Sequence, residues 1–90
     1  MRNPIRSTKT KEYDLFLKIL IESRKESGVG QRELGKKLDR TQSYVSKLER
    51  GDQRMDVIEL VQYCAAIGVP AAHVILKLEA AIKTTSSICV

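Results

Sequence analysis

Gln42, Ser43 and Lys47 are the residues of this chain whose types and spacing point most clearly to chemistry. Amide, hydroxyl and ammonium groups hydrogen-bond the edges of DNA bases, and glutamine suits a two-bond contact with adenine. Gln42 and Ser43 would begin a short helix, and Lys47 would follow one turn later on its outward face. This surface therefore indicates base reading. Each of the three can also be an ordinary solvated residue, and Lys47 can be a phosphate contact.

Two short helices folded back on one another must position this face. Their inward positions are apolar: Leu34, Leu38, Val45 and Leu48. Gly35 stands where the two backbones would approach most closely, and a residue without a side chain suits that contact. In the turn Asp39-Arg40-Thr41, Asp39 tolerates the left-handed conformation that ends the first helix, and Thr41 can cap the second. The pattern predicts a helix-turn-helix.

Residues 31–51 resemble the lambda-repressor-like helix-turn-helix family, which contains phage repressors, Cro and the XRE proteins. The likeness rests on the pattern Gln-x-x-Leu-Gly-x-x-Leu, a three-residue turn, and then Gln-Ser-Tyr-Val-Ser-Lys-Leu-Glu-Arg-Gly. It extends over roughly residues 13–78. Two positions depart from the family pattern, which usually has Gly at Asp39 and Ala at Gly35, and both replacements are stereochemically reasonable. The resemblance implies an all-α, DNA-binding domain.

The same resemblance assigns DNA contacts to particular residues. The family positions that match Gln42, Ser43 and Lys47 contact base edges, and the position that matches Gln31 approaches a phosphate. Basic residues around the rim can clamp the DNA backbone or be merely solvated: Arg40 in the turn, and Arg50 and Arg54 after the reading helix. Tyr44 can contact a phosphate or a thymine methyl group, or pack on the preceding helix.

Glu49 needs a separate explanation, because an acid beside a DNA-binding face would repel phosphates. In the family, a Glu at this position pairs with an Arg late in the first helix, and Arg24 stands in the matching place. The resemblance therefore implies an Arg24–Glu49 ion pair that ties the first helix to the third and makes both residues structural.

The net charge of +5 is unevenly distributed. Residues 1–11 contribute +4 and residues 31–54 contribute +3, whereas 12–30 and 55–90 contribute −1 each. The excess lies on the N-terminal arm and the reading unit, as in a protein that binds a polyanion. The basic arm can follow a DNA groove or be a solubilising tail.

Several other functions lack the residues that they require. No apolar run approaches a membrane span and no signal peptide is evident, so a cytoplasmic protein is expected. The two cysteines make neither a disulfide framework nor a zinc site; Cys64 fits a core position, and Cys89 fits a free thiol in the tail. With one His and no phosphate-cradling loop, we expect no enzyme activity, cofactor or metal.

Apolar periodicity and capping residues predict five helices. They begin near residues 11, 31, 42, 57 and 71, and the fourth opens with a capping box made by Asp56 and Glu59. The expected organisation is a basic arm over 1–10, a helix-turn-helix domain over 11–83 and a flexible tail over 84–90.

The last helix carries more apolar residues than one face of so small a domain can bury. One row runs along it at helical spacing: Val74, Leu78 and Ile82, broadened by Ile75. This row predicts a two-fold seam, through which family members present two reading helices to successive major grooves about 34 Å apart. The alternative is that the helix only closes the core of the monomer.

These patterns together predict a transcriptional regulator that reads an inverted repeat in double-stranded DNA as a homodimer. The alternative is an antitoxin-type protein-interaction module that binds a partner protein and autoregulates its operon.

Overall fold

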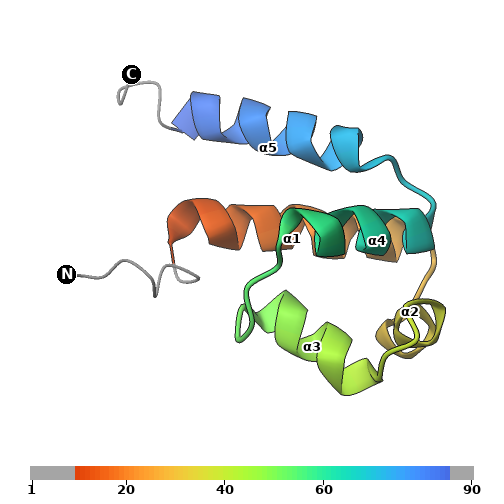
Figure 1. Ribbon diagram of the computed structural model, residues 1–90. Coiled ribbons are helices and arrows are strands. Elements are labelled where there is room, and N and C mark those ends of the chain that lie inside the picture. Colours follow the sequence, from red (N-terminus) through yellow and green to blue (C-terminus); the bar gives the residue numbers. More distant parts are fainter. Residues whose placement is uncertain (1–9, 86–90) are drawn as a thin grey trace.

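The computed structural model describes residues 10–85 and folds them into five α-helices (Figure 1). These are α1 (Lys11–Glu26), α2 (Gln31–Lys37), α3 (Gln42–Arg50), α4 (Val57–Ile67) and α5 (Ala71–Thr85). The all-α fold with five helices is confirmed. The last helix continues two residues past the predicted end of the domain at residue 83. The basic arm, apart from Thr10, and residues 86–90 of the predicted tail lie outside the described residues.

Short polar side chains set where three of the helices begin. The Oγ1 atoms of Thr10 and Thr41 accept hydrogen bonds from the backbone N–H groups of Tyr13 and Tyr44, each at 3.1 Å. Asp56 and Glu59 form the predicted capping box at α4, with both of its hydrogen bonds at 2.8 Å. Each bond satisfies an N–H group that has no partner within its own helix.

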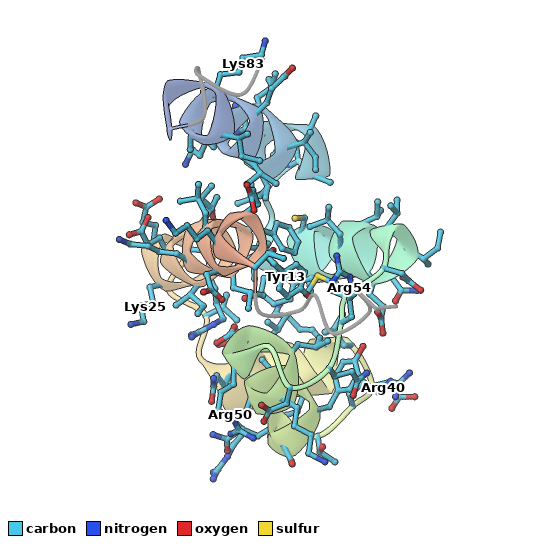
Figure 2. The ribbon with its side chains drawn as sticks, turned by 90° about the vertical axis from the view of Figure 1, so that its left-hand side faces the viewer. Tyr13, Lys25, Arg40, Arg50, Arg54 and Lys83 are labelled. Carbon is cyan, nitrogen blue, oxygen red and sulfur yellow. The ribbon has the colours of Figure 1, made fainter. Side chains whose placement is uncertain are left out.

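The helices lie in three layers. In Figure 1, α1 and α4 form the middle layer, α2 and α3 lie below them, and α5 crosses above; Figure 2 shows the same order from the side. The core lies between these layers, and its largest fully buried side chains come from every helix: Tyr63, Leu20, Leu34, Leu48, Val45, Val74 and Cys64. The helix-turn-helix pair α2–α3 and the helix α5 therefore occupy opposite sides of the middle layer.

The predicted seam along α5 is wrong for Val74, whose side chain has no exposure in the monomer. Leu78 also packs against the core, and Ile82 is half-buried. This row faces inward because α5 lies against α1, which buries one apolar stripe of α5 and leaves the neighbouring one in solvent. Of the predicted seam residues, only Ile75 is exposed, and Leu76 beside it is more exposed still.

Within residues 10–85, no single helix has both the length and the apolar character that a membrane span requires. Only α4 and α5 taken together meet both requirements, and this pair is bent by 114° at the break between the two helices.

Candidate nucleic-acid interface

The α2–α3 pair is built around one close backbone contact. A Cβ atom added to Gly35 would lie 2.9 Å from the carbonyl carbon and oxygen of Thr41, so only glycine fits without a shift of the backbone. The turn between the helices contains Asp39 in the left-handed conformation, with φ of 59°. The Arg40 N–H group donates to the Gly35 carbonyl at 2.7 Å and closes the turn. The predicted turn geometry is thus present.

The outward face of α3 carries the three residues expected to read bases. Gln42, Ser43 and Lys47 are exposed, whereas Val45 and Leu48 on the opposite face are buried. The buried face fixes the rotation of the helix about its own axis. The exposed amide, hydroxyl and ammonium groups therefore form a polar stripe on α3. This helix lies on the side of the middle layer opposite to α5 (Figure 1).

Arg40 and Arg50 lie on the two sides of α3 in Figure 2. The Arg40 guanidinium stacks over the Tyr44 ring, 4.5 Å from its centroid. Arg50 donates to one carboxylate oxygen of Asp52 at 3.0 and 2.8 Å and to the Ser46 hydroxyl at 2.6 Å. Both guanidinium groups are therefore held at the rim of the outward face of α3.

Arg54 lies higher on the molecule, at the level of the middle layer (Figure 2). Its guanidinium stacks on the ring of Tyr13, 4.8 Å from the centroid. The Tyr13 hydroxyl in turn accepts a hydrogen bond of 2.8 Å from the Met55 N–H group. Of the three arginines expected to contact phosphates, Arg54 is thus the one that stacks on a residue of α1.

Tyr44 makes a contact that its predicted arrangements did not include. It is half-buried, and its hydroxyl donates to Glu59 Oε2 at 3.0 Å, which links α3 to α4. Burial, and next the hydrogen bond to Glu59, raise the pKa of Tyr44, so the phenol remains protonated. In this arrangement the hydroxyl hydrogen of Tyr44 is donated to Glu59, and its ring supports the guanidinium of Arg40.

The predicted ion pair between Arg24 and Glu49 is present and buried. Arg24 Nε lies 2.7 Å from Glu49 Oε2 and Arg24 Nη2 lies 3.0 Å from Glu49 Oε1, with the two side chains only 8% and 4% exposed. The remaining guanidinium nitrogen, Nη1, donates to the Val29 carbonyl at 3.0 Å. This two-bond geometry fixes α3 to the end of α1.

Two further residues bind the same carboxylate. The Tyr63 hydroxyl donates to Glu49 Oε2 at 2.5 Å, and Gln31 Nε2 donates to Glu49 Oε1 at 2.9 Å. The Gln31 oxygen then accepts from Gln42 Nε2 at 3.4 Å. A continuous chain of hydrogen bonds thus runs from the core to the outward face of α3. We call its members the Glu49 network: Arg24, Gln31, Gln42, Glu49 and Tyr63.

Sequence reasoning missed Tyr63. The residue lies three positions after Leu60 and one before Cys64, so helical spacing would have placed it inward, and a buried tyrosine hydroxyl nearly always has a partner. That partner lies 14 residues away on another helix. Pattern alone does not show such a contact.

The comparisons with known proteins agree with this geometry. A family model described as a helix-turn-helix domain matches residues 20–74. Among solved structures, the chain is similar to an XRE-family like protein from Pseudomonas syringae pv. tomato str. DC3000. The two share 38% sequence identity with a TM-score of 0.77, over 88% of this chain and 96% of that one. The chain belongs to the XRE family of helix-turn-helix proteins. A comparison with curated proteins gave no match.

As an XRE-family protein, this chain is a DNA-binding regulator in general terms. Its Glu49 network has one protonation state at neutral pH. Burial alone would raise the pKa of Glu49, but hydrogen bonds from Arg24, Tyr63 and Gln31 outweigh it and lower that pKa below its usual value. Burial and the bond to Glu49 raise the pKa of Tyr63 well above its usual value. At neutral pH the network of this XRE protein is therefore a carboxylate that only accepts hydrogen bonds, surrounded by groups that donate them.

Proposed function

We propose that this XRE-family protein is a transcriptional regulator that reads an inverted-repeat operator in the major groove as a homodimer. The single observation that carries the proposal is the polar outward face of α3, on which Gln42 is held by a hydrogen bond from its amide nitrogen to Gln31. This exposed contact of 3.4 Å connects Gln42 to Gln31, which in turn donates to the buried Glu49.

The hydrogen-bonding state of Gln42 suits adenine. One N–H bond of its amide is used on Gln31, which leaves one N–H donor and the carbonyl acceptor free. Adenine presents the complementary pair in the major groove, N7 as acceptor and the N6 amino group as donor. Lys47 suits the acceptors of guanine, and Ser43 suits either base. Each good two-bond pair contributes about 1–3 kcal/mol of discrimination between bases.

Phosphate contacts around this face fix the register of the protein on DNA. We assign them to Arg40 and Arg50, which flank α3, and to Arg54 beside Tyr13. Gln31 keeps one amide hydrogen that neither Glu49 nor Gln42 uses, and this hydrogen can bind a phosphate. Replacing Arg40, Arg50 or Arg54 should weaken binding to all sequences alike and reduce its salt dependence. Replacing Gln31 should in addition disturb base discrimination, because Gln31 contacts Gln42.

An exposed apolar patch supports the homodimer. It consists of side chains from α4 and α5: Val57, Ile58, Val61, Ile75 and Leu76. Val57 and Ile75 line the same groove of about 270 Å³, together with Phe16 and Leu78. We assign the seam to this patch rather than to the row containing Val74. A two-fold axis through this patch would relate the two α3 helices of the homodimer to one another.

Selection from a random duplex library tests the proposal. We expect the enrichment of an inverted repeat with half-sites about one helical turn apart, and the relaxation of one base pair per half-site in the Gln42→Ala variant. The matched control is Gln62→Ala, which removes an exposed glutamine from α4 and should leave the preference intact. Weak, sequence-blind binding with a steep salt dependence would overturn the proposal.

The same patch favours one second candidate, the antitoxin-type module. An exposed apolar surface that binds a partner protein would also explain why α4 and α5 leave five large apolar side chains in solvent. Sedimentation separates the two candidates. A homodimer at micromolar concentration favours the regulator, whereas a monomer that forms a stable complex with the product of a neighbouring gene favours the module.

A further inference from the structure

The hydroxyl of Tyr63 is the least expected part of the Glu49 network. Its side chain is fully buried, and a phenylalanine would fill the same space between α4 and the core. A buried hydroxyl is costly unless it is hydrogen-bonded, and this one donates to Glu49 Oε2 at 2.5 Å. The hydroxyl therefore acts through Glu49 rather than through packing.

The network has only one consistent direction of donors and acceptors. A carboxylate accepts hydrogen bonds and donates none, so Gln31 must turn its amide nitrogen toward Glu49. Its oxygen then faces Gln42, and Gln42 must turn its own nitrogen toward Gln31. The buried carboxylate of Glu49, acting through Gln31, thus sets the orientation of the exposed amide of Gln42.

Tyr63 completes the set of donors around that carboxylate. Glu49 Oε2 accepts from Arg24 Nε and from Tyr63, while Glu49 Oε1 accepts from Arg24 Nη2 and from Gln31. Four donors thus occupy about four lone-pair sites of an ionised carboxylate. With every lone-pair site occupied, the Glu49 carboxylate is fixed in one orientation, and Gln31 can donate to only one position on it. Loss of the Tyr63 hydroxyl would leave a vacant site on Oε2 and release this constraint.

We propose that Tyr63 is a positioning residue for base reading, whose buried hydroxyl acts through Glu49 and Gln31 to hold the Gln42 amide in the orientation that matches adenine. The inference rests on the proposed function, because it requires Gln42 to read a base. It extends the set of residues that determine specificity from the exposed face of α3 to the interior of α4.

The test compares two variants that each remove one buried phenol oxygen. Tyr63→Phe removes the hydroxyl of the network, and Tyr13→Phe removes one whose partner is the Met55 N–H group. The affinity of each variant is measured for the selected operator and for duplexes that carry the other base pairs opposite Gln42. All measurements are made below the melting temperature of the variant. For Tyr63→Phe we expect discrimination at the base pair opposite Gln42 to fall about 3- to 10-fold, which is less than for Gln42→Ala. Discrimination at the other base pairs of the operator should be unaffected. Tyr13→Phe should keep the discrimination, even if it weakens binding to every site.

A second measurement does not depend on DNA. In the free protein, the side-chain amide signals of Gln31 and Gln42 in nitrogen-15 spectra should shift in Tyr63→Phe and stay in place in Tyr13→Phe. In a Gln42→Ala background, Tyr63→Phe should not relax the base pair any further.

Two outcomes would overturn the inference, and they are distinguishable. If Gln42→Ala relaxes one base pair but Tyr63→Phe lowers binding equally at all sites or not at all, Tyr63 is only structural and the proposed function stands. If the wild-type protein has no base preference that depends on Gln42, the proposed function fails and the inference fails with it.

Discussion

The two outer layers of this protein are held by different kinds of contact. Below the middle layer, α3 is tied to α1, α2 and α4 by directed hydrogen bonds to one buried carboxylate, Glu49. Above it, α5 is held by apolar side chains such as Val74 and Leu78, which pack without a required direction. Hydrogen bonds fix angles as well as distances, whereas apolar burial is non-directional. The face proposed to read DNA is therefore the rigidly specified one, and the face proposed to bind a second copy is not.

The largest expected effect is on the polar side of this comparison. Arg24→Ala removes one partner of a buried pair and leaves the charge of Glu49 uncompensated, so the free energy of unfolding should fall by about 3–5 kcal/mol. Arg50→Ala is the matched control, because its pair with Asp52 is exposed and should contribute less than about 1 kcal/mol. Urea unfolding of both variants measures the difference. Equal losses would mean that burial does not set the strength of these pairs.

On the apolar side, Val74→Ala should lower the free energy of unfolding by about 1.5–3 kcal/mol, since it removes apolar surface that is fully buried in the monomer. Ile75→Ala, one residue away, should leave the stability of the monomer almost unchanged and weaken self-association. Thermal unfolding at several protein concentrations, together with sedimentation, distinguishes the two. A concentration-dependent loss for Val74→Ala would restore Val74 to the seam.

The contact inside the helix-turn-helix should also be sensitive to a single methyl group. Gly35→Ala places a Cβ atom 2.9 Å from the Thr41 backbone, so the turn must shift, and we expect a loss of about 1–2 kcal/mol despite the better helix propensity of alanine. Lys36→Ala, on the exposed side of the same helix, should be neutral within about 0.5 kcal/mol. A stabilised Gly35→Ala protein would show that the turn yields more easily than its contacts indicate.

The smallest effect at neutral pH concerns the titration of Glu49. The lowered pKa of this carboxyl means that its contribution to stability is fully present above its unfolded pKa, near 4.5, and is lost as the pH falls through its folded pKa. Urea unfolding between pH 7 and pH 3 should therefore give a flat region followed by an acid loss. Asp52→Asn, at an exposed pair, should leave that acid loss in place. A protein whose stability rose with acid would contradict the charged state of the network.

The sequence was informative where residue type and spacing both constrain the structure. Asp39 and Gly35 indicated the turn because few residues accept a left-handed backbone or a backbone contact of 2.9 Å. The family pattern led to the Arg24–Glu49 pair. Those parts of the prediction depend on chemistry that admits few alternatives.

The remaining features depend on which element packs against which. The apolar residues of α5 occupy more than one stripe, and nothing in their order shows that Val74 faces α1 while Ile75 faces solvent. Tyr44 and Tyr63 bind carboxylates of residues 15 and 14 positions away, on other helices. Such partners follow from the three-dimensional packing of α3 against α4, so local pattern did not reveal them.

Base reading by Gln42 is tested most directly by the affinities of the wild-type protein and of Gln42→Ala for four operators that differ only in the base pair opposite Gln42. We expect the wild-type protein to prefer adenine at that position by about 1–3 kcal/mol. Gln42→Ala should bind all four alike and retain discrimination elsewhere. An identical profile for the two proteins would contradict this expectation, because Gln42 would then be held in place without reading a base.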